Sequence, residues 1–150
     1  MQLLFGLMLF FSINASAYDF EVDGIYYNFL ENNSVEVTTG GNRSIPTASY
    51  KGDMTISQTV FYEDTEYNVI AIGEDAFYRC SSLTSIYLPD GITSIGNYAF
   101  NSCSSLTSIT LPGSISNIGT SVFQYCSSLV SIIIPEGVTK IDESTFWTCI

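Results

Sequence analysis

A fixed spacing of 23 residues runs through the second half of this 150-residue chain. Cysteines stand at positions 80, 103, 126 and 149, and a phenylalanine lies three positions before each of them. A unit of this length cannot bury its apolar face alone, so copies must stack and share one core. The spacing therefore predicts a β-rich repeat solenoid in which the repeated side chains form interior ladders. These ladder residues are Phe77, Phe100, Phe123 and Phe146, with Cys80, Cys103, Cys126 and Cys149.

Each clean repeat contains a short apolar strand that ends at a proline, as from Leu83 to Pro89. Proline has no backbone N–H, so it ends the stretch of a coil that can join a ladder. Strands of successive coils should then lie side by side as a parallel sheet on one face of the solenoid. The apolar positions that we assign to the interior of one repeat are Leu83, Ile86, Leu88, Ile92, Ile95, Ala99, Phe100 and Cys103.

Inward and outward side chains alternate along each of these strands. The outward positions form rows of small, uncharged residues with one aromatic ring, and the sheet faces of solenoids commonly bind partners. We interpret these rows as the candidate binding face; the alternative is a solvated sheet surface filled with residues of high β propensity. The residues are Ser85, Tyr87, Ser108, Thr110, Ser131 and Ile133.

Residues 1–17 have the anatomy of a secretory signal peptide. The apolar run from Met1 to Ile13 is too short to cross a bilayer as a helix, and Ala15-Ser16-Ala17 follows as a small-x-small cleavage site. One departure is that no lysine or arginine precedes the apolar run. We therefore predict a secreted or cell-surface protein whose mature chain has no membrane span.

Two further segments complete the expected organisation. Residues 18–52 alternate apolar and polar side chains between turn residues, which predicts a small antiparallel β N-terminal cap followed by a loop. Residues 53–150 form the solenoid, whose first repeat carries an inserted hairpin at Thr59–Tyr67. Because the chain stops inside a repeat, we expect this solenoid to be C-terminally incomplete.

Composition limits the chemistry. The net charge is −11, from fifteen acidic residues against four basic ones, so the chain offers no basic patch for nucleic acid. The sequence contains no histidine, which removes the usual catalytic triads and the common zinc sites. We predict that the protein is not an enzyme and needs no metal or cofactor.

The four cysteines allow three interpretations. An even number in a secreted chain is typical of disulfides, and four thiolates could bind a metal. Residues one period apart in a solenoid stand in a line about 4.8 Å apart, which neither converges on a metal nor suits a disulfide. We favour a buried ladder of free thiols that act as small apolar side chains. Pairing of Cys80 with Cys103, and of Cys126 with Cys149, is the remaining alternative.

The repeat pattern Leu-x-x-Ile-x-Leu-Pro, followed by Ile-x-x-Ile-Gly-x-x-Ala-Phe-x-x-Cys, resembles the BspA-like leucine-rich repeats of bacterial surface proteins. The resemblance covers Asp53 to Ile150, and the segment Asp19 to Tyr27 is similar to the cap that precedes such repeats. It implies a right-handed solenoid of the leucine-rich repeat type, without catalysis. The family is associated with exported or surface-attached proteins implicated in adhesion and host interaction.

Two functional hypotheses follow. The first is an exported, non-enzymatic protein that binds an extracellular protein or glycan through a repeat surface and so mediates adhesion. The second is a structural spacer that displays another domain lying beyond Ile150. The ligand itself is not encoded in any motif of this sequence.

Overall fold

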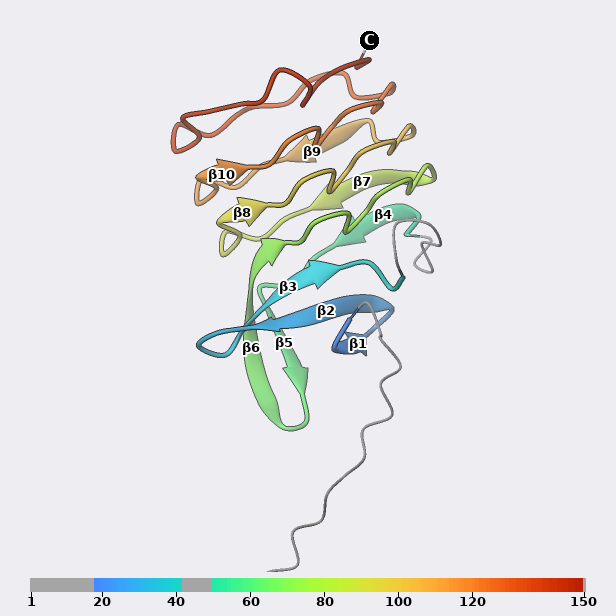
Figure 1. The fold of residues 1–150 in the computed structure, drawn as a ribbon. Coiled ribbons are helices and arrows are strands. Elements are labelled where there is room, and N and C mark those ends of the chain that lie inside the picture. Colours follow the sequence, from blue (N-terminus) through green and yellow to red (C-terminus); the bar gives the residue numbers. More distant parts are fainter. Residues whose placement is uncertain (1–17, 42–49, 150) are drawn as a thin grey trace, which may run out of the picture.

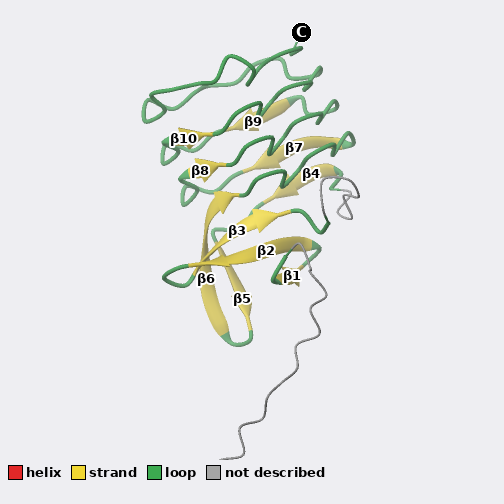
Figure 2. Ribbon diagram, in the orientation of Figure 1, coloured by secondary structure: helices red, strands yellow, loops and turns green. Residues whose placement is uncertain are grey.

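The computed structural model describes residues 18–41 and 50–149, and all the regular elements within these ranges are β-strands. Figure 1 shows a stack of coils with the blue N-terminal strands at one end and the red C-terminal coil at the other, and Figure 2 shows short strands between longer loops. This is the expected β-rich repeat solenoid. The predicted signal peptide, residues 1–17, and part of the loop after the cap, residues 42–49, lie outside the described residues. Within the described ranges no helix is long and apolar enough to cross a membrane.

An antiparallel meander forms the N-terminal end of the stack. It consists of β1 (Phe20–Val22), β2 (Ile25–Leu30) and β3 (Ser34–Thr38), paired in that order. Its turns contain residues with positive φ, Asp23 and Gly24 in one and the two asparagines at positions 32 and 33 in the other. These residue types tolerate the left-handed conformation, which explains why the chain reverses at these points.

A hairpin joins the meander to the first coil. It consists of β5 (Thr59–Tyr62) and β6 (Thr65–Ile72), which pair antiparallel, while β6 also runs parallel to β3. Two of its rings pack on the meander, with ring centroids 4.4 Å apart for Phe20 and Tyr62 and 5.1 Å apart for Phe29 and Tyr67. The insertion predicted in the first repeat is therefore fixed to the N-terminal strands by aromatic contacts.

Two parallel sheets continue from this end. On one side, β8 (Ser94–Ile95) and β10 (Asn117–Ile118) follow β6, and on the other β4 (Gly52–Thr55), β7 (Leu83–Tyr87) and β9 (Ser108–Thr110) form a three-stranded sheet. Paired residues stand one repeat apart, as Ser85 with Ser108 and Ser94 with Asn117. The residues of these strands therefore lie beside their counterparts in the next coil.

The core contains a column of phenylalanine rings. Phe77, Phe100, Phe123 and Phe146 stack with centroid separations of 5.0, 5.6 and 5.6 Å and interplanar angles of 4°, 5° and 8°. Tyr50 extends this column toward the meander, because its ring lies 4.8 Å from that of Phe77 and its hydroxyl donates to the carbonyl of Thr38 at 3.1 Å. The residues assigned to the interior of one repeat, from Leu83 to Cys103, are all buried.

The cysteines form a second column beside the phenylalanines. All four are free thiols, and the Sγ atoms of Cys103, Cys126 and Cys149 donate to the backbone carbonyls of Phe77, Phe100 and Phe123 at 3.1, 3.1 and 3.0 Å. The thiols are thus more than the small apolar side chains that the spacing predicted, because each adds a second hydrogen bond to a phenylalanine carbonyl of the preceding coil that already accepts a backbone N–H.

Burial keeps these thiols protonated and able to donate. It raises the pKa of Cys80 to about 11 and that of Cys126 to about 12, and it raises the pKa of Cys103 well above the ordinary value. Thiolate formation is therefore suppressed at neutral pH, which removes the nucleophile and metal-ligand chemistry of cysteine from the column.

Two positions of the repeat adopt the left-handed conformation without being glycine, the first in three coils and the second in four. One position is occupied by Asp75, Tyr98 and Ser121, with φ of 57°, 56° and 53°. The other is occupied by Arg79, Ser102, Tyr125 and Thr148, with φ of 60°, 64°, 62° and 64°. In these turns the backbone N–H of one coil donates to the next, as from Tyr98 to Thr120 at 3.0 Å and from Phe100 to Val122 at 3.0 Å. The inter-coil hydrogen bonds stabilise a backbone conformation that most side chains disfavour.

Glycine sets the closest approach between coils. A Cβ atom at Gly96 would lie 2.5 Å from the backbone nitrogen of Glu74, whereas a Cβ atom at Gly113 would meet no atom within 4 Å.

We predict that Gly96→Ala lowers the free energy of unfolding by about 2 to 3 kcal/mol, because the backbone of two coils must move apart. Urea unfolding followed by circular dichroism measures the change. Gly113→Ala is the matched control and should stay within about 0.5 kcal/mol of the unmodified chain; equal losses in the two variants would contradict the close-contact explanation.

Candidate binding surface

The six predicted binding residues lie together on the outward side of the three-stranded sheet. One row runs through Asp53, Ser85, Ser108 and Ser131, which pair in sequence across β4, β7, β9 and the next coil. A second row runs beside it through residues of the same strands, and both rows are at least partly exposed to solvent. We call this surface the outer face. The members of the second row are Thr55, Tyr87 and Thr110, which pair across the three strands, and Ile133 holds the same repeat position in the coil that follows them.

Asp53 fixes the polar end of the outer face. Its Oδ1 atom accepts hydrogen bonds from Ser85 Oγ at 2.6 Å and from Thr84 Oγ1 at 2.8 Å. These bonds from the Ser85 and Thr84 hydroxyls lower the pKa of the Asp53 carboxyl below its ordinary value, because they stabilise the charged form. The next coil repeats part of this arrangement, since Thr107 Oγ1 donates to the backbone carbonyl of Thr84 at 3.1 Å. Several hydroxyls of this end are therefore already bound within the chain.

Beyond this end the outer face combines hydroxyls with exposed apolar side chains, since Ser108, Thr110 and Ser131 continue its rows. Tyr87 is 54% exposed at the centre of the second row, and Val130, which precedes Ser131, and Ile133 are 86% and 85% exposed. Large apolar side chains that face solvent are typical of surfaces that bind another molecule. The outer face thus has hydroxyls along its length and exposed aliphatic side chains in its last coil.

Six residues of this surface were identified from the sequence, but others were missed. Asp53 stands at the start of the predicted solenoid, and its bonds to Thr84 and Ser85 depend on pairing across an insertion that interrupts the 23-residue spacing. Val130 occupies the position held by threonine in the two preceding repeats. This departure from the repeat was a signal that could have identified it.

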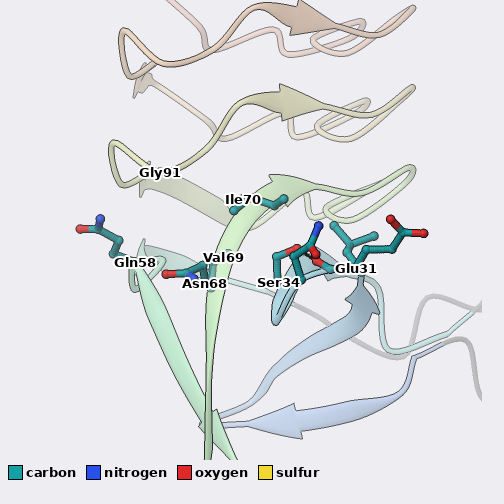
Figure 3. A pocket seen from close by; sticks show the side chains of 9 residues that line it. Glu31, Ser34, Gln58, Asn68, Val69, Ile70 and Gly91 are labelled. Atoms are coloured by element: carbon teal, nitrogen blue, oxygen red, sulfur yellow. Dashed lines mark hydrogen bonds between the residues drawn. The ribbon is translucent and has the colours of Figure 1, made fainter.

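A separate pocket lies where the meander meets the first coil. It has a volume of about 470 Å³ and is lined mostly by amide, hydroxyl and aliphatic side chains, with one carboxylate. Figure 3 shows Asn68, Val69 and Ile70 of β6 between Gln58 and Gly91 on one side and Ser34 and Glu31 on the other. The remaining lining residues are Leu30 and Asn32. None of these residues belongs to the outer face, so the pocket is a distinct feature.

The described residues contain no arrangement that suggests metal chemistry. Within residues 18–41 and 50–149 no group of three or more cysteines, aspartates or glutamates is placed to hold a metal ion. What the outer face offers is hydrogen bonding from exposed hydroxyls and apolar contact from Tyr87 and its neighbours.

Comparison with known proteins identifies the repeat. Residues 43–150 match the BspA type leucine rich repeat region, in six copies. No curated protein sequence matches the chain.

Several solved structures share the fold. A leucine-rich repeat protein from Bacteroides ovatus is 36% identical with a TM-score of 0.71, and the alignment covers 81% of this chain and 30% of that protein. A leucine-rich repeat protein from Bacteroides capillosus is 29% identical with a TM-score of 0.71, covering 85% of this chain and 90% of that protein. A leucine rich cell surface protein from Faecalibacterium prausnitzii is 26% identical with a TM-score of 0.69, covering 87% of this chain and 40% of that protein. The chain thus spans less than half the length of the first and third of these relatives.

The polar end of the outer face gives a prediction about Asp53. The carboxyl pKa of Asp53, measured by NMR titration, should lie below that of an aspartate in an unfolded peptide and should rise in the Ser85→Ala variant, which lacks the shorter hydrogen bond. Ser108→Ala removes a hydroxyl from the same row without touching Asp53 and should leave this pKa unchanged. An unaltered Asp53 pKa in Ser85→Ala would show that the serine does not bind the carboxylate in solution.

Proposed function

This chain belongs to the family of BspA-type leucine-rich repeat proteins, and we propose that it is a cell-surface protein that binds another protein through the outer face. The observation that carries the proposal is the exposed ring of Tyr87 on β7, together with the exposed side chains of Val130 and Ile133 in the coil that follows the three-stranded sheet. Such side chains are unfavourable in water and favour a partner that covers them. An adhesive role is the form of binding that fits a surface protein of this family.

The chemistry of the outer face favours a protein partner over a glycan. Branched aliphatic side chains such as Val130 and Ile133 suit apolar protein surfaces, and aromatic residues such as Tyr87 are enriched at protein interfaces. A sugar needs a dense set of free hydrogen-bonding groups, whereas the hydroxyls of Thr84, Ser85 and Thr107 are bonded within the chain. Binding of a glycan instead of a protein is an outcome that the experiment below distinguishes.

Export and the domain boundaries belong to the same proposal. We propose that residues 1–17 are a signal peptide, that residues 18–52 cap the solenoid and that residues 53–150 form it. The pairing of β3 with β6 supports the cap, because this pairing covers the strand that would otherwise be the edge of the sheet. Similarity to the leucine rich cell surface protein of Faecalibacterium prausnitzii supports the location.

One observation favours a spacer as the second candidate function. The bonds from Ser85 and Thr84 to Asp53, and from Thr107 to Thr84, satisfy hydroxyls that a binding surface would present to a partner. A solenoid with such self-contained rows would hold another domain away from the cell without binding through its own sheet.

Substitution of Tyr87 separates the two functions. We expect Tyr87→Thr, which inserts the residue that Thr110 supplies in the next coil, to weaken binding at least fivefold, because truncation of a central aromatic side chain commonly costs more than about 1 kcal/mol. Biolayer interferometry with a panel of matrix proteins, mucins and free glycans measures the loss. Tyr125→Ser is the matched control, since Tyr125 is 48% exposed away from the outer face and Ser102 occupies the equivalent position.

Three results would argue against the proposal. Binding no stronger than that of an unrelated acidic protein would remove the binding function and leave the spacer. Equal effects of Tyr87→Thr and Tyr125→Ser would place the binding site elsewhere. Binding to free glycans alone would replace the protein partner with a carbohydrate.

A further inference from the structure

A second concave site lies at the N-terminal end of the three-stranded sheet, away from the centre of the outer face. It is a groove of about 550 Å³ between the β1–β2 turn, β4 and β5. Its lining is mixed, with the hydroxyls of Thr55, Ser57 and Thr59 and the carboxylate of Asp23 among apolar side chains. The apolar residues that line it include Val22, Ile25, Tyr27, Met54 and Val60.

The edge strand β4 directs unpaired backbone groups away from its sheet. β4 is the outermost strand of the order β4-β7-β9, and the N–H groups of Gly52 and Ile56 donate to β7 and its flank at 2.8 and 3.0 Å. Alternate residues of a strand bond to opposite sides, so Asp53 and Thr55 direct their N–H and C=O groups away from β7. These groups have no backbone partner among the described residues.

The strand β5 presents a second free edge to the same groove. β5 pairs only with β6, and the N–H of Val69 donates to the carbonyl of Gln58 at 2.9 Å. The alternation that follows from this bond turns the backbone groups of Thr59 and Phe61 away from β6. Both residues line the groove. Two unpaired strand edges thus border one depression, which is the geometry that accepts an added strand.

The charge around the groove indicates the kind of strand. Among the described residues, Asp23 is the only charged residue that lines it. Lys51, immediately before β4, is the single basic residue flanking these strands, and the chain as a whole carries a net charge of −11. A partner segment with a lysine or arginine is therefore attracted, and an acidic segment is repelled.

We propose that the groove binds an extended, basic peptide segment of a partner protein, which adds to β4 as an edge strand. Its backbone bonds to the N–H and C=O groups of Asp53 and Thr55, its alternate apolar side chains cover Met54 and Val60, and its basic side chain faces Asp23. This site shares Asp53 and Thr55 with one end of the outer face but uses their backbone groups, so it can bind whether or not Tyr87 and the C-terminal end of the outer face bind a partner.

The direct test uses a fluorescein-labelled heptapeptide of alternating threonine and valine with a central lysine, and fluorescence anisotropy as the readout. We expect saturable binding to the purified chain. In the first pattern, four alternate residues of the heptapeptide are N-methylated, which removes the N–H donors on one edge of the peptide. In the second pattern, the three residues between them are N-methylated, which removes the donors on the opposite edge. One pattern should weaken binding about tenfold, since about two hydrogen bonds are lost, and the other should leave it within about twofold.

Asp23→Asn tests the role of charge without disturbing the turn. Asp23 has a φ of 52°, a conformation that asparagine tolerates. We expect this variant to bind the lysine peptide about threefold more weakly, as for an exposed ion pair, and to bind a norleucine version as the unmodified chain does. Asp64→Asn is the matched control, because Asp64 has a φ of 62° at the tip of the β5–β6 hairpin and does not line the groove.

Each of four results would overturn the proposal. The first three are no saturation at millimolar peptide, equal effects of the two methylation patterns, and equal effects of Asp23→Asn and Asp64→Asn. The fourth is self-association of the chain that excludes the peptide, which would make a second copy the occupant. Tyr87→Thr should leave peptide binding unchanged. Failure of the outer face as a binding surface is therefore distinguishable from failure of the groove.

Discussion

Contact between adjacent coils at the phenylalanine and cysteine columns is the interaction on which the rest of the structure depends. The rings of Phe77, Phe100 and Phe123 are nearly parallel at 5.0 and 5.6 Å, and the thiol of each following cysteine binds the carbonyl of the phenylalanine one coil earlier. This spacing is close to the distance between hydrogen-bonded strands. Ring stacking inside the coil and strand pairing on its faces therefore require the same separation, and neither strains the other.

That shared spacing determines what the exposed surfaces can do. Because each coil lies directly over the last, Thr55, Tyr87 and Thr110 occupy one row although they are far apart in sequence. The interior of each repeat is restricted to a few side chains, whereas the outward positions vary from serine to tyrosine to isoleucine. The outer face can therefore change its partner without a change in the core, which is the property that suits repeat proteins to recognition.

The periodic parts of the structure were predictable, and the exceptions to the period were not. Alternation and the 23-residue spacing predicted the meander, the hairpin and the buried side chains, because burial alone requires these patterns. The left-handed residues Tyr98 and Ser102 gave no such signal, since their backbone N–H groups donate to the next coil and these bonds stabilise the conformation. Tyr50 stood in a stretch that reads as loop, and the groove beside β4 depends on which strand edges remain unpaired. These features arise from contacts between segments distant in sequence, which a local pattern does not record.

Every coil stacks on the last in a register of one repeat, and both proposed binding sites depend on this stacking. The measurement that tests it most directly is a set of NMR nuclear Overhauser effects between the aromatic protons of phenylalanines labelled one at a time. The structure predicts strong effects between Phe77 and Phe100 and between Phe100 and Phe123, and none between Phe77 and Phe123. Effects between the first and third rings, or none between neighbours, would contradict the stacking.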